Sequence, residues 1–408
     1  MQSRVPGWHF RPDERTSASI AAMTVLNADQ LALRDAVREL AEAKIAPRAA
    51  EIDLAGEFPR DIVELLARHD MLAVPFPPEY GGLGADMISV LLVIEEISRV
   101  DASCGLIPAV QELGALPLMH KGTDEQKQRW IPDLASGRKL AAFALTEAGA
   151  GSDAASARTS ATRDGDAWIL NGEKRFISQG DVADVVAVFA VTDPSPDAKK
   201  QKRHMTCFYV EKGTKGYTSP RIEHKMGIRG STTAELAFNS ARVPDVNRVG
   251  EAGDGWELIM KTFERSRSGI AAQAVGISQG ALDAAARYAN ERKQFGKPIG
   301  AHQMIGAMLA DMATRTEAAR QLLWTAAEHI EQGDKHAARW ASMCKLFAGD
   351  TAMAVTTDAV QILGGYGYTT EYPVERMMRD AKITQLYEGT QQIQRLIIAR
   401  SILEEYHQ

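Results

Sequence analysis

The chain has 408 residues, of which 45% are hydrophobic and 25% charged, and its formal net charge is −6. This length exceeds what one core usually organises, so we expect two or three domains of an ordinary soluble globular protein. The charge gives no electrostatic reason to expect nucleic acid as a partner. No stretch approaches the roughly 20 apolar residues that a membrane span requires.

The three cysteines are far apart and form no CxxC pair, and the histidines show no HExxH spacing. This pattern favours a reducing compartment and predicts neither a disulfide framework nor a metal site. Residues 1–26 are predicted to form an N-terminal extension, and residues 1–22 lack the apolar core of a secretory signal. A cytoplasmic location is therefore the default expectation.

From residue 27 to 140, apolar residues recur three and four positions apart, which predicts an N-terminal α-helical domain. From 141 to 250 the period changes to two, which predicts strands. Residues 159–178 read as strand, Asp-Gly turn, strand, Asn-Gly turn and strand, so we expect a middle antiparallel β domain. From 251 to 408 four long helical runs are separated by short breaks, which predicts a four-helix bundle. The predicted fold class is therefore α+β.

The segment LTEAGAGSD (145–153) contains glycines that match a dinucleotide fingerprint. That fingerprint needs a helix after the glycines, within a βαβ unit. Here the following residues have the pattern of β-hairpins, so we reject a Rossmann site. The alternatives are a structural turn or a loop whose backbone and hydroxyl groups, including those of Thr146 and Ser152, face a ligand.

Three further segments have both a functional and a structural interpretation. Phe176 and Ser178 share one face of a strand and would suit a flat heterocycle, or simply a β core. Arg292 ends a helix, where it could hold a pyrophosphate or cap carbonyl groups. Gly364-Gly365 could let a cofactor approach the backbone, or form a plain interhelical turn.

Glu388 is a lone carboxylate between Tyr387 and Gly389, preceded and followed by apolar residues. Apolar surroundings disfavour the charged form and raise the pKa of a carboxyl group toward the range of a general base. Most glutamates taken alone are surface or capping residues. The surrounding motifs favour a catalytic role here.

Five segments occur in a specific order: LTEAGAGSD, the NGEK segment, RKQFG, QILGGYGY and RDAK-x4-YEGT. On these motifs the chain resembles the acyl-CoA dehydrogenase flavoprotein family, specifically its straight-chain, short- and medium-chain-like members, over roughly residues 27–404. The family architecture has the same α, β, α order. The resemblance implies FAD as the cofactor, an acyl-CoA thioester as substrate and an electron-transfer flavoprotein as partner.

The resemblance also implies roles for individual residues. Glu388 would be the catalytic base. Ser152, Arg267 and Gly389 would meet the substrate. The implied FAD contacts are Leu145, Thr146, Phe176, Ile177, Ser178, Arg292, Phe295, Gln303, Gln361, Gly364, Gly365, Thr390 and Gln392, with a neighbouring subunit contacting the adenine end.

The implied reaction belongs to fatty acid β-oxidation. Glu388 removes the α-proton of the thioester, the Glu388 backbone N–H binds the carbonyl oxygen, and hydride passes from the β-carbon to the flavin, giving a trans-2-enoyl-CoA. The family is usually a homotetramer. The apolar face of the last helix, including Leu396 and Ile402, would suit a subunit interface, although an intramolecular core explains it equally well.

The chain departs from the family pattern at several positions. Branched-chain and long-chain members carry their base at the position of Ser266, and serine cannot serve as a base, which favours Glu388. Glu264 is expected to point away from the base's face of that helix. Glutaryl-CoA enzymes carry an arginine where this chain has Gly105. The wall at 103–113 looks mostly apolar, and many members have tryptophan and threonine at Phe176 and Ser178.

Three alternatives remain open on the sequence. An acyl-CoA oxidase of the same fold would share the base, but such enzymes are typically longer. A flavin monooxygenase would not need Glu388. A non-catalytic acyl-CoA-binding scaffold would tolerate loss of the base and of the cofactor contacts, and neither loss is seen.

Overall fold

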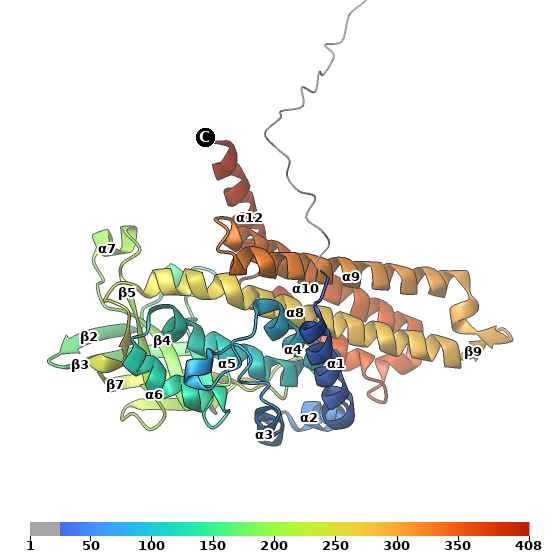
Figure 1. The fold of residues 1–408 in the computed structure, drawn as a ribbon, viewed down its shortest axis with the longest axis horizontal. Coiled ribbons are helices and arrows are strands. Elements are labelled where there is room, and N and C mark those ends of the chain that lie inside the picture. Colours follow the sequence, from blue (N-terminus) through green and yellow to red (C-terminus); the bar gives the residue numbers. More distant parts are fainter. Residues whose placement is uncertain (1–24, 408) are drawn as a thin grey trace, which may run out of the picture.

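A computed structural model describes residues 25–407 of the chain. Almost all of the predicted N-terminal extension, 1–26, lies outside these residues. The described chain consists of a helical part, a β part and a second helical part, in the predicted order (Figure 1). This arrangement confirms the predicted α+β fold class.

Helix α4 packs against α1 and α5 and is buried along most of its length, including the side chains of Glu95 and Glu96. Asn27 begins the first helix with a capping box to Gln30, and Asp86 caps α4. The helices of this part are α1 (Ala28–Leu40), α2 (Ala49–Ala55), α3 (Arg60–Arg68), α4 (Met87–Val100), α5 (Ala102–Lys121) and α6 (Asp124–Ala135).

Helix α5 differs from the expectation that no stretch approaches a membrane span. Among residues 25–407 it is the one helix long and apolar enough to cross a membrane, by length and composition alone, and 83% of its apolar window is buried within the fold. It packs against α4, the long helix α8 (Gly255–Glu291) and strand β1 (Ala141–Ala144). Burial in the protein core therefore accounts for its apolar composition.

The β domain contains one eight-stranded sheet in the order β6-β7-β3-β2-β4-β5-β8, with β1 beside β4. Most neighbouring strands are antiparallel, as predicted, but β1 and β2 pair with β4 in parallel. The short helix α7 (Pro196–Lys200) connects β4 to β5. The remaining strands are β2 (Ser160–Asp164), β3 (Ala167–Ser178), β4 (Val185–Val191), β5 (Met205–Glu211), β6 (Tyr217–Ile222), β7 (Thr233–Pro244) and β8 (Arg248–Val249).

The Asn-Gly turn predicted at 171–172 is wrong, because β3 runs straight through it. Gly172 has φ +141°, and the pairing with β7 shifts register between Leu170 and Gly172. The pair therefore forms a β-bulge, in which glycine supplies a conformation that other residues rarely adopt. The Asn171 side chain accepts a hydrogen bond from the Ser240 N–H across the bulge. The predicted Asp-Gly turn at 164–165 does connect β2 to β3.

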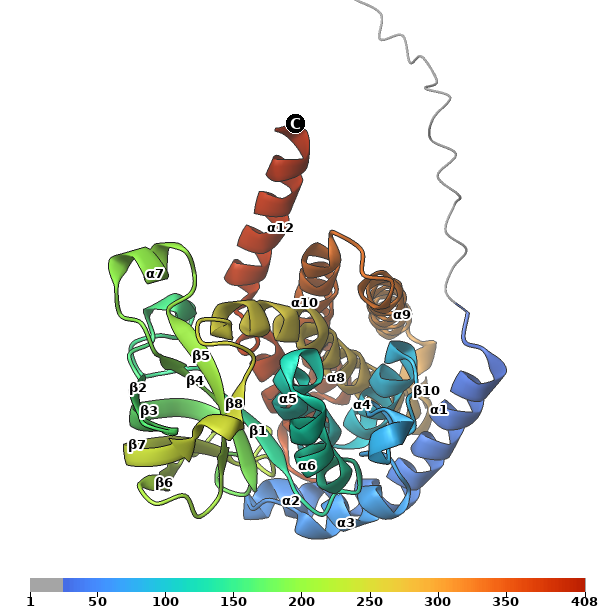
Figure 2. The same cartoon turned by 60° about the vertical axis from the view of Figure 1, so that its left-hand side comes forward.

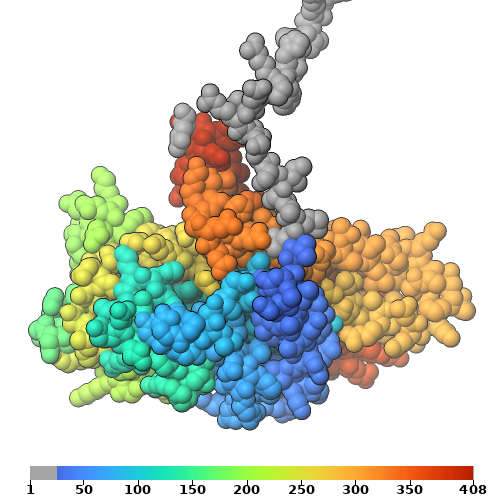
Figure 3. Space-filling view, in the orientation of Figure 1, coloured from blue at the N-terminus to red at the C-terminus, as the bar shows by residue number. Residues whose placement is uncertain are grey.

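The C-terminal part is built on three long helices, α8, α9 (Gln303–Glu331) and α10 (Ala337–Leu363), which pack against one another. Helix α8 also packs against α4 and α5 of the N-terminal part, and the fourth predicted run contacts α8 through α11. The last helix, α12 (Gln391–Tyr406), packs on α10 at both of its ends, because Gln391 donates to Asp350 at 3.0 Å and Glu405 pairs with Arg339 at 2.6 Å. Its C-terminal end projects from the body (Figures 1 to 3). The smaller elements are β9 (Lys293–Gln294), β10 (Lys297–Pro298) and α11 (Val374–Ala381).

The apolar side chains of α12 do not form an intramolecular core. Leu396 is 63% exposed and Leu403 60%, and the buried side chains of this helix are Gln391 and Gln394. Of the two explanations for the apolar face, the core is therefore excluded for this chain. Helix α8, by contrast, spans the molecule from the β domain to β9 and connects the two ends of the fold (Figure 1).

Candidate active site

Glu388 lies on a tight turn between α11 and α12. Its backbone has φ +53° and that of Gly389 has φ +90°, so two consecutive residues are in the left-handed region. A left-handed glutamate costs on the order of 1 kcal/mol and is maintained only where the surroundings fix it. Thr390 then caps α12 by accepting a hydrogen bond from the Ile393 N–H.

Three side chains from different elements hold the carbonyl groups of this turn. Gln394 of α12 donates to the Glu388 oxygen at 3.0 Å and to the Gly389 oxygen at 2.9 Å. Lys345 of α10 donates to the Gly389 oxygen at 2.7 Å. Arg267 of α8 approaches the Glu388 oxygen with Nε at 3.5 Å. These contacts keep the Glu388 side chain directed toward α8 and α5.

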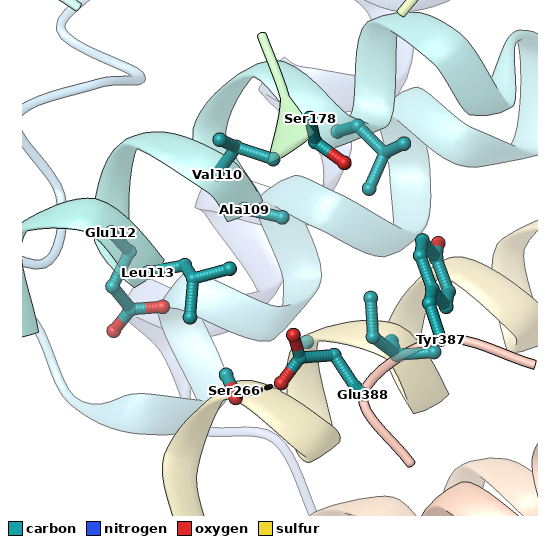
Figure 4. Close-up of a pocket in the computed structure, with 11 residues that line it drawn as sticks. Ala109, Val110, Glu112, Leu113, Ser178, Ser266, Tyr387 and Glu388 are labelled. Atoms are coloured by element: carbon teal, nitrogen blue, oxygen red, sulfur yellow. Dashed lines mark hydrogen bonds between the residues drawn. The ribbon is translucent and has the colours of Figure 1, made fainter. Parts of the chain in front are cut away.

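The Glu388 carboxylate accepts a hydrogen bond from the Ser266 hydroxyl at 2.6 Å (Figure 4). Burial raises the pKa of Glu388 above its ordinary value, while Ser266, Arg267 and Lys345 act in the opposite direction. A carboxylate with a raised pKa is a stronger base than an exposed one. The direction agrees with the expectation from sequence that Glu388 has apolar surroundings.

The carboxylate faces a small cavity of about 40 Å³ between α5, α8 and the end of β3. Most of its lining is apolar, as predicted for the α5 wall. Glu112 is a charged residue in this wall, and its carboxylate pairs with Arg265 of α8 at 2.5 Å. The lining residues are Leu106, Ala109, Val110, Glu112, Leu113, Ser178, Ser266, Gly269, Ile270, Tyr387 and Glu388.

Two further features complete the cavity. Among the described residues, no acceptor is within hydrogen-bonding distance of the Glu388 N–H, so this donor is available to a ligand. The Tyr387 hydroxyl donates to Gln273, and Gln273 in turn donates to the Ala102 carbonyl at 2.9 Å. This chain of contacts locks the turn to α8 and the start of α5.

The predicted flavin-ring residues gather beside this cavity. Ser178 lines it, and Leu145, Thr146, Phe176 and Ile177 lie on the neighbouring ends of β1 and β3. Phe176 has φ +58° and is 61% exposed, so it leaves the regular strand and presents its ring to the surface. A bulky residue in this conformation is an outlier typical of functional sites.

The loop at 145–153 is held by a buried ion pair. Lys174 donates to the Leu145 carbonyl at 3.0 Å and to Glu147 at 2.8 Å, and Glu147 accepts from the Arg158 and Thr159 N–H groups. A 3-10 turn and strand β2 follow, with no α-helix, which confirms that this is not a Rossmann site. Ser152 is exposed on this loop and does not line the cavity.

A second group of predicted FAD residues lies at the other end of α8. Arg292 ends α8 with its guanidinium 5.7 Å from the Tyr366 ring centre. Phe295 is 92% exposed, and a Cβ added at Gly364 or Gly365 would meet open space. The whole group is Arg292, Phe295, Gln303, Gln361, Gly364 and Gly365.

These two groups cannot contact one small molecule within a single chain. Arg292 follows Ser266 by 26 residues along one continuous helix, which is about 39 Å at 1.5 Å per residue. Thr390 and Gln392 lie at the start of α12, on the Glu388 side. Within residues 25–407, no group of three His, Cys, Asp or Glu side chains could hold a metal ion.

Comparison with known proteins gives the family. The chain matches the N-terminal domain of acyl-CoA dehydrogenase over residues 27–138, the middle domain over 142–241 and the C-terminal domain over 253–403. A probable acyl-CoA dehydrogenase of Mycobacterium tuberculosis is 49% identical over 371 residues, covering 91% of this chain and 94% of that protein. The chain belongs to the acyl-CoA dehydrogenase family.

Solved structures agree with this family. Butyryl-CoA dehydrogenase from Megasphaera elsdenii superimposes with a TM-score of 0.90 at 40% identity, covering 93% of this chain and 99% of that one. A chain from a study of the electron transferring flavoprotein of Acidaminococcus fermentans also gives 0.90, at 45% identity, with the same coverage. The protein is thus an acyl-CoA dehydrogenase family enzyme.

Several site residues of this acyl-CoA dehydrogenase cannot be identified from the sequence. The sequence marks Ser266 only as the position of a missing base, whereas its hydroxyl donates to Glu388. Lys345, Gln394 and Glu112 belong to no motif that the sequence reveals. A lysine in the apolar run of α10 is the one signal that could have been noticed. Glu264, as predicted, does not line the cavity.

Proposed function

We propose that this protein is an FAD-dependent dehydrogenase that converts an acyl-CoA thioester to its trans-2-enoyl-CoA. The observation that carries the proposal is the Glu388 carboxylate, held on a strained turn and facing a small, mostly apolar cavity. Such a cavity suits an acyl chain. The carboxylate at its edge suits removal of a proton next to the thioester carbonyl.

The geometry supports separate roles for the backbone N–H and the side-chain carboxylate of Glu388. The free Glu388 N–H would donate to the thioester oxygen and stabilise the enolate that develops there. The Glu388 carboxylate would take the α-proton, with Ser266 holding it in place at 2.6 Å. The apolar walls exclude water, which strengthens both interactions.

The residues beside the cavity fit a flavin ring. Phe176 offers an exposed aromatic face, and Ser178 offers a hydroxyl where β3 meets the cavity. FAD would supply the hydride acceptor for the β-carbon. Leu145, Thr146 and Ile177 would position the ring, and Thr390 and Gln392 lie on the same side of the molecule.

The rest of the cofactor needs a second subunit. Arg292 and its neighbours are about 39 Å from Ser266 along α8, so the pyrophosphate and adenine of one FAD would be held by another copy of the chain. This separation and the exposed apolar side chains of α12 support a homo-oligomer. We propose the homotetramer that is usual in the family.

Reoxidation by an electron-transfer flavoprotein, a place in fatty acid β-oxidation and a cytoplasmic location complete the proposal. The similarity to a chain from a study of an electron transferring flavoprotein supports the proposed reoxidation by such a partner. The similarity to butyryl-CoA dehydrogenase and the small cavity support a short, straight acyl chain. Ser152, Arg267 and Gly389 stay our proposed substrate contacts, although Arg267 is buried behind the turn.

The test is an anaerobic titration of the purified yellow protein with saturated acyl-CoAs from butyryl to palmitoyl. We expect the visible flavin band to bleach with the shortest chains, and mass spectrometry to find an enoyl-CoA two hydrogens lighter. Rapid reoxidation by air with peroxide release would favour the oxidase instead. No bleaching by any acyl-CoA would favour the monooxygenase or the scaffold.

A further inference from the structure

Lys345 is a fully buried lysine in the middle of α10. Lysine is almost never fully buried unless it is paired, because the ammonium group loses its hydration. Burial lowers the pKa of Lys345 to about 8. Within residues 25–407 no carboxylate lies close enough to form a salt bridge with it, so the cost of its burial is not offset by an ion pair.

Within the described part of the chain, the hydrogen bonds of the Lys345 ammonium all go to the segment that follows Glu388. It donates to the Gly389 carbonyl at 2.7 Å and to the Gln391 side chain at 3.2 Å. Gln391 in turn donates to the Leu346 carbonyl at 2.8 Å, one residue along α10. A Cβ added at Gly349 would meet the Gln391 amide at 3.0 Å, so α10 and this segment are tightly packed. Lys345 is therefore fixed relative to the turn.

Charged groups approach Glu388 from several elements. Arg267 reaches it from α8 and Lys345 from α10, and both favour its ionised form. Tyr387 is neutral, because burial raises its pKa well above the ordinary value. Glu112 faces the cavity from α5 but is paired with Arg265. Asp350 acts on Lys345, and Glu264 acts on Arg267 from the same helix, so each of the two cations also has an acidic neighbour other than Glu388.

We propose that Lys345 is a positioning residue that keeps Glu388 ionised and its turn in the left-handed conformation, so that carboxylate and N–H face the cavity together. This inference rests on the proposed function of Glu388 as the base. This role would explain why a lysine, whose ammonium group is unfavourable to bury, occupies a position in an otherwise apolar stretch of α10.

Two substitutions separate the charge from the hydrogen bond. Lys345→Gln keeps an N–H donor for the Gly389 carbonyl, and Lys345→Met removes both donor and charge. Loss of the positive charge raises the pKa of Glu388, so the acidic limb of the pH profile of flavin reduction moves to higher pH. We expect this shift in both variants, by about one unit if the cation contributes like a typical nearby charge.

Difference infrared titration of the Glu388 carboxyl, with Glu388→Gln as the blank, gives the same pKa without turnover. Lys382→Gln is the matched control, because Lys382 is exposed and only six residues before Glu388 in the chain. This control should leave unchanged both the acidic limb of the pH profile and the infrared titration of Glu388. Melting temperatures within a few degrees of wild type establish that the variants fold.

A Lys345 variant that loses rate at every pH, with an unmoved acidic limb and an unmoved Glu388 titration, would contradict the proposal and leave only a packing role. If wild type shows no acyl-CoA-dependent flavin reduction, the proposed function fails. The infrared titration still decides whether Lys345 sets the ionisation of Glu388.

Discussion

The site depends on one residue, Glu388, in a conformation that glutamate seldom adopts. The left-handed backbone turns its side chain into the cavity while its N–H stays free, and neighbouring donors stabilise this arrangement. Ser266 supplies the hydrogen bond that compensates part of the carboxylate's burial. A charge-assisted hydrogen bond of this kind contributes about 1.5–3 kcal/mol.

Ser266→Ala should therefore raise the pKa of Glu388 by about one unit or more, since one unit corresponds to about 1.4 kcal/mol. As the proposed base, Glu388 must be ionised, so activity is lost as the pH falls through this pKa, and the acidic limb of the pH profile should move to higher pH. Steady-state rates across pH measure the shift. Ser268→Ala is the control, because Ser268 is buried two residues away and contacts Cys344 instead. If the acidic limbs of Ser266→Ala and Ser268→Ala lie at the same pH, this role for Ser266 is contradicted.

Among the elements, β3 shows most clearly where local sequence patterns mislead. Asn-Gly commonly marks a hairpin turn, but here the sheet continues on both sides and the glycine forms a bulge. The second register shift, between Lys174 and Ile177, brings Phe176 to the surface beside the cavity. The end of β3 is thus shaped by two irregularities.

Gly172→Ala should destabilise the protein by about 1–3 kcal/mol, as expected for strain at an unfavourable φ. The added Cβ would also lie 2.7 Å from the Thr159 backbone. Urea unfolding of the apoprotein measures the loss. Gly165→Asn is the control, because Gly165 occupies an open turn and asparagine tolerates its left-handed φ of +62°. If Gly172→Ala loses no more unfolding free energy than Gly165→Asn, the bulge tolerates a side chain and the prediction is wrong.

At the scale of the whole molecule, α8 holds the two halves of the proposed cofactor site apart. One FAD would therefore contact the Glu388 end of one subunit and the Arg292 end of another. This arrangement predicts complementation between subunits that are defective at opposite ends. The cavity that Glu388 and Ser178 line belongs to one chain and by itself does not predict complementation between subunits.

Glu388→Gln and Arg292→Ala subunits should each be impaired alone and regain activity when co-expressed. In the mixed oligomer, one site combines an intact Glu388 end with an intact Arg292 end. The measurement is acyl-CoA-dependent flavin reduction per bound FAD in hybrids isolated with two affinity tags. Hybrids no more active than the separate variants would indicate that each site is built from one chain.

Periodicity was sufficient to predict the α, β, α order, because the apolar spacing of long helices and strands is strong. It could not predict that α4 and α5 of the N-terminal part also pack against α8, since an apolar helix face does not specify its partner. For the site, the motif around Glu388 is the basis for proposing this residue as the base. Lys345 and Ser266 could not be assigned, because their roles depend on contacts between residues far apart in sequence.

The central claim is that Glu388 removes the substrate α-proton, and rapid anaerobic mixing with butyryl-CoA tests it most directly. We predict that Glu388→Gln lowers the rate constant of flavin reduction by about 10²- to 10⁴-fold, the usual contribution of a general base. Glu264→Gln, the matched control on α8, should reduce flavin at close to the wild-type rate, because Glu264 does not line the cavity. Equal rates for wild type and Glu388→Gln would contradict the account.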